Sequence, residues 1–164
     1  MPRTPMHHWR IYQSIGAMGH IGQAKPPAPL GSVSAMVRQT VRVLIADDSA
    51  PVLLATSDLV GEYPDVEVVS LAMDVDEAVR FSAGRKPDLA LVDAWLRGGG
   101  AELAARKIRS ASPGTAVVAL SSSKEPELSR KIEAAGGFGC YEKEKLSAVL
   151  PGILSTVRRL IESA

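Results

Sequence analysis

The stretch that decides the fold is Pro87-Asp88-Leu89-Ala90-Leu91-Val92-Asp93-Ala94-Trp95. Its four apolar residues, 89–92, run without a break into the acid Asp93. A short, continuous apolar run is typical of a strand that is buried on both faces of a parallel sheet. Sheets of this kind bind ligands where strands end and loops begin, so Asp93 is placed like a reactive group.

Similar patterns lie on both sides of this stretch. Predicted strands cover residues 41–46, 66–72, 116–120 and 138–142, and a helical pattern follows each of them. Strands that alternate with helices predict a doubly wound α/β fold, in which a five-stranded parallel sheet is covered on both faces. The expected strand order is 2-1-3-4-5, the flavodoxin-like arrangement, with a switch point between the first and third strands.

Three helix starts follow from capping chemistry. Ser49 is expected to cap the first helix, and Asp74 or Asp76 the second. In the last helix, Pro151 falls in the first turn if Ser147 is the N-cap. Otherwise the helix kinks at Pro151, because proline removes a hydrogen bond and crowds the preceding turn.

Composition excludes several classes of protein. Lys and Arg number 19 and Asp and Glu 18, so a net charge of +1 gives no general attraction to nucleic acid. No run of 18 apolar residues exists that would span a membrane. The single cysteine, Cys140, rules out an internal disulfide and fits a reducing compartment. We expect a cytoplasmic protein.

Residues 1–40 show neither a helical nor a strand period. They are rich in proline and glycine and hold all three histidines of the chain, His7, His8 and His20. A metal site at the histidines is conceivable, but no cysteine or carboxylate lies nearby, which favours a solvated tail. We expect a flexible tail over 1–40, or a misassigned start with translation from Met36, and one domain over 41–164.

Polar side chains end four of the predicted strands. Asp47 and Asp48 follow the first strand, and Asp93, Ser121 and Lys143 end or follow the third, fourth and fifth. Carboxylates at neighbouring strand ends repel one another unless a cation intervenes, and Mg²⁺ prefers carboxylates together with waters and phosphate oxygens. With Lys143 and Ser121 neutralising the phosphoryl oxygens, the set suits phosphoryl transfer to Asp93.

At these residues the sequence resembles the receiver (response-regulator, CheY-like) domain family. The segments 43–49, 91–93, 119–121 and 136–143 are similar to its acidic pair, phosphoacceptor, Thr/Ser strand end and lysine. The intervals between the motif residues, 93−48 = 45, 121−93 = 28 and 143−121 = 22, are close to those of the family. The resemblance covers about residues 41–163.

The resemblance implies a function and a set of roles. A histidine kinase or phosphotransfer protein would donate a phosphoryl group to Asp93, making the chain a stoichiometric phosphoacceptor rather than an enzyme. Mg²⁺ would be held by Asp48, Asp93 and the carbonyl of Trp95, with Asp47 acting through water. The bulk of the Trp95 side chain would slow self-hydrolysis of the phosphorylated form.

The sequence departs from the family pattern in three places. Arg97 replaces a common proline beside a glycine triplet, so we expect a looser loop there. Cys140 stands at the usual aromatic switch position, and we expect Tyr141 to point to the other face of the sheet. Glu144 follows Lys143 where the family often has a cis proline, so the local turn is expected to differ.

The last predicted helix runs to about Glu162 and the sequence stops at Ala164, so we expect the output to be a protein contact rather than a second domain. In the family this contact runs through the fourth helix, fifth strand and fifth helix, which here include Arg130, Lys131, Tyr141, Arg158 and Arg159. A homodimer, a relay partner or a target protein would suit this face. A merely solvated face is an equal alternative.

Two other classes remain as alternatives. A receiver-like module that binds partners regardless of phosphorylation is suggested by Arg97 and Cys140, although all five site residues are retained. A hydrolase like the haloacid-dehalogenase phosphatases needs an Asp-x-Asp motif, and Asp93-Ala94-Trp95 lacks the second acid.

Overall fold

The computed structural model describes residues 39–164 of the chain. The predicted flexible tail, its histidines and the alternative start at Met36 lie outside the described residues. Within the described part, no helix is long and apolar enough to cross a membrane.

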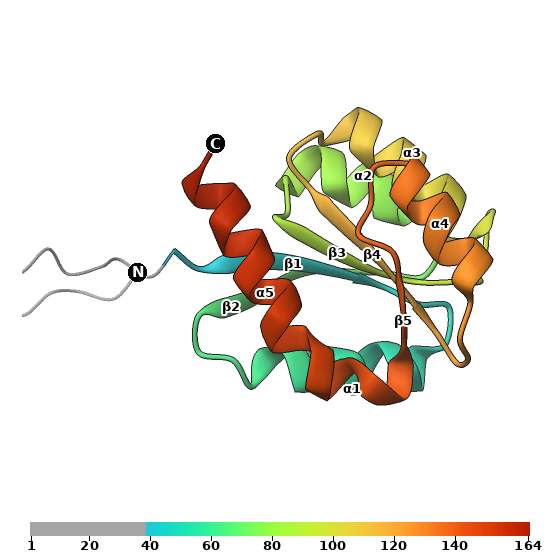
Figure 1. The fold of residues 1–164 in the computed structure, drawn as a ribbon, viewed down its shortest axis with the longest axis horizontal. Helices are drawn as coiled ribbons and strands as arrows, with labels where there is room; N and C mark the ends of the chain where they lie inside the picture. Colours follow the sequence, from blue (N-terminus) through green and yellow to red (C-terminus); the bar gives the residue numbers. More distant parts are fainter. Residues whose placement is uncertain (1–38) are drawn as a thin grey trace, which may run out of the picture. The chain divides into compact units, whose positions relative to one another are not determined.

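Five parallel strands form one sheet in the order β2-β1-β3-β4-β5, as predicted (Figure 1). The strands are β1 (Val41–Ala46), β2 (Val66–Ala72), β3 (Leu89–Asp93), β4 (Ala116–Ser121) and β5 (Cys140–Glu142). The helices are α1 (Ala50–Gly61), α2 (Val75–Arg85), α3 (Gly100–Ala111), α4 (Pro126–Ala134) and α5 (Leu146–Glu162), with a 3₁₀ turn, η1 (Lys143–Lys145), before α5. The fifth strand is shorter than the predicted 138–142.

Two apolar layers explain why β3 reads as an unbroken apolar run. Leu89 and Leu91 pack in the layer beneath α1 and α5. Ala90 and Val92 pack in the layer beneath α2, α3 and α4. Figure 1 shows these two sets of helices on opposite faces of the sheet. Because β3 is central and covered on both sides, each of its residues is buried.

The sheet register brings the ends of the strands to one edge. Ala46 of β1 pairs with Val92 of β3, so the acids that follow each of them are neighbours. Asp93 pairs with Leu120 of β4, one residue before Ser121. The polar residues at the strand ends therefore converge at the carboxyl edge, as parallel pairing requires.

The helix starts agree with the sequence in two cases out of three. Asp74 caps α2, since its Oδ1 accepts the N–H of Glu77 at 2.8 Å. Ser49 is the N-cap residue of α1, as predicted, although its side chain makes no capping hydrogen bond. Ser147, the conditional N-cap of the last helix, does not cap α5, because η1 precedes the helix and Lys145 is the N-cap. Pro151 consequently lies inside α5, beyond its first turn.

Candidate functional site

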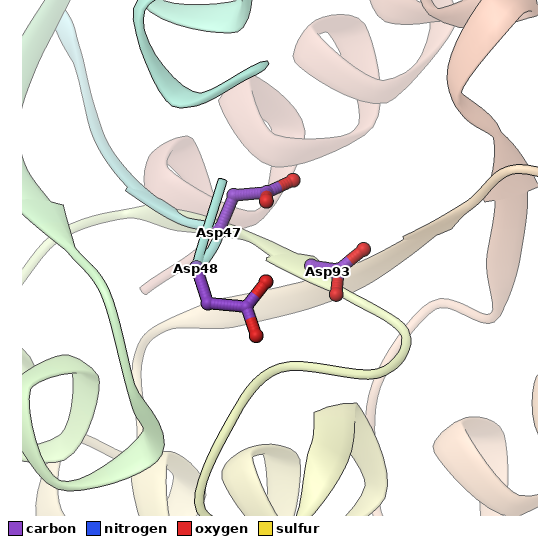
Figure 2. A group of neighbouring side chains, drawn as sticks. All are labelled: Asp47, Asp48 and Asp93. Atoms are coloured by element: carbon purple, nitrogen blue, oxygen red, sulfur yellow. The ribbon is translucent and has the colours of Figure 1, made fainter. Parts of the chain in front are cut away.

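Three carboxylates gather where β1 and β3 end. Asp47 and Asp48 follow β1 and Asp93 ends β3, and one oxygen of each lies within 4.8 Å of the others. Figure 2 shows the three side chains beside one another at the ends of these neighbouring strands. Asp47 and Asp93 are only 5% and 9% exposed, whereas Asp48 is exposed. Two acids are thus held in the rim of the core while the third faces solvent.

Lys143 bridges the two buried acids. Its Nζ lies 2.7 Å from Asp47 Oδ2 and 2.6 Å from Asp93 Oδ1. Burial by itself lowers the pKa of Lys143, but the hydrogen bonds and charges of Asp47 and Asp93 outweigh it, so the pKa is raised. Lys143 therefore remains an ammonium at neutral pH, and it offsets the repulsion between two carboxylates taken out of water.

The remaining oxygens of the buried acids are held by backbone groups. The N–H of Ser49 donates to Asp47 Oδ1 at 2.9 Å, so Ser49 stabilises the site through its backbone and not through its hydroxyl. The N–H of Trp95 donates to Asp93 Oδ2 at 3.1 Å. Both acids are therefore fixed at both oxygens. Asp48 makes no side-chain hydrogen bond or ion pair within residues 39–164.

This set of donors fits a hard divalent cation. Magnesium prefers one or two carboxylates together with waters and substrate oxygens, rather than a closed cage of protein ligands. Here Asp48 is exposed and free of side-chain hydrogen bonds and ion pairs within residues 39–164, and its carboxylate lies beside those of the buried Asp93 and Asp47. The residues present therefore suit Mg²⁺, and the individual ligand roles remain predictions.

Ser121 and Trp95 frame the same edge from the next positions. The hydroxyl of Ser121 is fully buried at the end of β4, and its Oγ accepts the N–H of Ser123 at 3.4 Å. The side chain of Trp95 is 66% exposed, so only its backbone takes part in the hydrogen bonds around Asp93. The roles predicted for Ser121 and for the Trp95 carbonyl remain predictions.

Backbone hydrogen bonds hold the loop between β3 and α3, and the looseness expected relative to the family stays a prediction. The N–H of Val75, the first residue of α2, donates to the carbonyl of Arg97 at 3.0 Å. Gly100 N–H donates to the Leu96 carbonyl at 2.8 Å, and Leu96 itself is buried. Arg97 also pairs with the capping Asp74 at 3.8 Å. Sequence reasoning missed α2 as the partner of this loop.

The glycines of this loop serve shape rather than looseness. All three residues of Gly98–Gly100 have positive φ, at 95°, 127° and 75°. Residues with a Cβ avoid that region, so the turn requires glycine. At Gly100 an added Cβ would lie 3.0 Å from the Ala94 carbonyl oxygen.

Cys140 and Tyr141 point to opposite faces of the sheet, as predicted. Cys140 packs against the layer beneath α2, α3 and α4, and Tyr141 against the layer beneath α1 and α5. Burial raises the pKa of the Cys140 thiol, and the charges of Glu125 and Asp93 raise it further. These effects favour the protonated thiol over the thiolate at neutral pH.

The charged residues predicted for an α4–β5–α5 contact face are partly engaged within the molecule. Arg158 pairs with Asp65 at 2.6 Å, and Arg159 donates to the Thr156 hydroxyl at 3.2 Å. The α4 residues Arg130 and Lys131 lie at 3.9 Å from Glu127 and Glu102, respectively. These contacts leave both the contact face and the solvated face as open alternatives.

Comparisons with known proteins agree with this geometry. The family model described as response regulator receiver domain matches residues 43–151. A protein-glutamate methylesterase/protein-glutamine glutaminase of Geobacter metallireducens is 37% identical over 109 residues, which are 66% of this chain and 30% of that protein. The response regulator GacA of Pseudomonas viridiflava is 28% identical over 103 residues, 63% of this chain and 48% of that protein.

A solved structure shares the fold. The signal receiver domain of NarL from Mycobacterium tuberculosis aligns with a TM-score of 0.68 at 24% identity, covering 73% of this chain and 98% of that one. The chain spans less than half the length of the two curated relatives above. The methylesterase and glutaminase activities in the first relative's name therefore belong to a protein that is much longer than the matched part.

Proposed function

This chain belongs to the response regulator receiver domain family, and we propose that its Asp93 accepts a phosphoryl group from a histidine kinase or phosphotransfer protein. The observation that carries the proposal is Lys143, whose ammonium lies on both buried acids at 2.7 and 2.6 Å while Asp48 stays unengaged beside them. A nucleophile, a fixed positive charge and a carboxylate that can bind a cation then lie side by side. Protein contacts in the cytoplasm would pass the signal on.

The proposed transfer is a displacement at phosphorus. An oxygen of Asp93 forms a bond to phosphorus, and the phosphorus–nitrogen bond to the donor histidine breaks, leaving its electron pair on the imidazole nitrogen. Lys143 is already in contact with Asp93, so its ammonium meets the transferred oxygens without a large movement. Ser121 donates its hydroxyl to the same group from the end of β4.

The metal role rests on the carboxylates. Asp48, Asp93 and the carbonyl of Trp95 would hold Mg²⁺, with Asp47 acting through water. When bound, Mg²⁺ supplies positive charge that offsets the charge of the transferred oxygens. The protein's own contribution is position, because the two buried acids are fixed at both oxygens before any phosphoryl donor arrives.

The test is the intact mass of the full chain after incubation with acetyl phosphate, with and without Mg²⁺. We expect one phosphoryl adduct that requires Mg²⁺ and is absent in Asp93→Ala. Asp76→Asn is the matched control, because the Asp76 side chain is 94% exposed on α2, and it should form the adduct normally. An adduct that persists in Asp93→Ala would overturn the assignment.

A second candidate is a binding module that works without phosphorylation. The observation that favours it is Cys140, which brings a small thiol to the face of β5 where the family has an aromatic ring. A folded chain that never forms the adduct would support this candidate. The proposal above is preferred because it accounts for the paired acids and Lys143.

A further inference from the structure

A groove separate from the acidic site lies between the β3–α3 loop and the start of α4. Its volume is about 600 Å³, and its walls come from residues 94–102 on one side and from Glu125, Glu127, Leu128 and Lys131 on the other. Figure 1 shows α3 and α4 next to each other on one face of the sheet. None of Asp47, Asp48 or Lys143 lines this groove, so the proposed phosphoryl transfer does not explain it.

An exposed aromatic ring forms part of the wall. Trp95 is 66% exposed, more than any other large apolar side chain in the described part of the chain. The face of an indole ring attracts cations, and guanidinium groups stack on it especially well. Gly98–Gly100 also line the groove, and they add backbone but no side chains to its wall.

The charge left over on the groove is negative. Its lining holds two cations, Arg97 and Lys131, and three acids, Glu102, Glu125 and Glu127, so one negative charge is in excess. Three long ion pairs touch these residues: Arg97 with Asp74 at 3.8 Å, Lys131 with Glu102 at 3.9 Å and Arg130 with Glu127 at 3.9 Å. All three are exposed and screened by solvent, so none fixes its partners. Glu125 accepts a hydrogen bond from the Ser123 hydroxyl at 3.1 Å and forms no ion pair within residues 39–164.

We propose that this groove binds an arginine-bearing segment of a partner protein. The guanidinium stacks on the Trp95 indole, and the carboxylates of Glu125 and Glu127 pair with its N–H groups. Arginine suits the site better than lysine because a planar guanidinium both stacks on a ring and pairs with carboxylates. A nucleotide is the other ligand that an exposed tryptophan and a glycine loop attract, but its phosphates would meet the surplus acids.

The binding does not rest on the proposed phosphoryl transfer, because it involves no residue of the acidic site except the backbone neighbour Trp95. It is therefore tested on the full chain without a phosphoryl donor. The chain has two tryptophans, so Trp9→Phe leaves Trp95 as the single tryptophan, which is excited at wavelengths that the three tyrosines do not absorb. The probe is a hexapeptide that alternates arginine and leucine, titrated while Trp95 emission is recorded.

We expect saturable quenching that weakens as salt is raised, since exposed charges are screened. A peptide with citrulline in place of arginine keeps the shape without the charge and should bind at least fivefold more weakly. Glu125→Gln with Glu127→Gln should weaken binding about threefold to tenfold. Glu162→Gln is the matched control, because Glu162 is exposed at the far end of α5, and it should leave the affinity unchanged.

The ring is tested with the same peptide carrying fluorescein, followed by anisotropy. Trp95→Leu should weaken binding roughly twofold to thirtyfold, and its exposed position predicts an unchanged thermal unfolding midpoint. Equal binding of the citrulline peptide, equal binding by Trp95→Leu, or no saturable binding would each overturn the proposal. So would guanosine diphosphate quenching Trp95 more strongly than the peptide does, which would favour a nucleotide pocket.

Discussion

Asp93 and Trp95 lie two residues apart, yet their surroundings are opposite. Asp93 is 9% exposed and is held at both oxygens, by Lys143 and by the N–H of Trp95. The Trp95 side chain is 66% exposed and belongs to an open groove. The sheet fixes the position of Asp93, because this residue still belongs to the central strand β3. The Trp95 side chain lies beyond the strand and outside the packed core.

This contrast separates two kinds of task within one loop. A reactive carboxylate needs a fixed geometry, and strand pairing with two apolar layers supplies it. A recognition residue needs access, and Trp95, two residues beyond the end of β3, has it. Chemistry and partner choice are therefore expected to respond to different substitutions. Four predictions test this, in order of expected effect.

Lys143→Met should reduce the rate of phosphoryl transfer from acetyl phosphate by about a hundredfold or more. The substitution keeps the length of the side chain but removes the charge aimed at the transferred oxygens, and a single such donor is worth two to three orders of magnitude. Lys145→Met is the control, because Lys145 is exposed and its Nζ lies 3.1 Å from Glu142, away from the acidic site. Adduct formation is followed by intact mass against time. A Lys143→Met rate within threefold of the parent would show that the bridging ammonium is structural only.

Asp48→Asn should weaken Mg²⁺ binding roughly tenfold or more while leaving stability nearly unchanged. The exposed Asp48 makes no side-chain hydrogen bond or ion pair within the described residues, so its replacement costs the fold little. Isothermal titration calorimetry with MgCl₂ measures the affinity, and urea unfolding measures the stability. Asp76→Asn again serves as the matched exposed acid. Unchanged Mg²⁺ affinity would remove Asp48 from the ligand set.

Gly100→Ala should destabilise the protein by about 1–3 kcal/mol. Gly100 has a φ of +75°, and a Cβ there would approach the Ala94 carbonyl oxygen at 3.0 Å. Gly84→Ala in α2 is the opposite control: a Cβ there meets nothing within 4 Å, so it should stabilise by about 0.5–1 kcal/mol. Both values come from urea unfolding midpoints at constant slope. If Gly100→Ala were neutral, the loop would be as loose as its glycines suggest.

The sequence alone was enough for the sheet and for the acidic edge. Residues 89–92 alternate between two apolar layers, so an unbroken apolar run is the signature of that strand and of the acid that ends it. The loop that follows carried no such signal. A hydrogen bond from the Val75 N–H to the Arg97 carbonyl ties this loop to α2. Because both groups belong to the backbone, residue types give no sign of it. For the same reason, the turn Lys143–Lys145 that moves the start of α5 could not be read from residue types.

The smallest effect on a reaction rate is expected at Trp95, the exposed residue of the pair. Trp95→Asn should speed self-dephosphorylation of Asp93 by roughly threefold, which corresponds to less than 1 kcal/mol of barrier. The indole is mostly exposed, so its expected influence is to cover the approach of water to the acyl phosphate. The decay of the phosphoryl adduct by intact mass after removal of acetyl phosphate measures the rate. Leu54→Asn is the control, because Leu54 is also an exposed apolar residue but lies on α1, and this substitution should leave the decay unchanged. An unchanged rate in Trp95→Asn would assign the ring to the groove alone. A loss of phosphorylation itself would mean that Asp93 depends on the exposed side chain, and the separation between the two positions would fail.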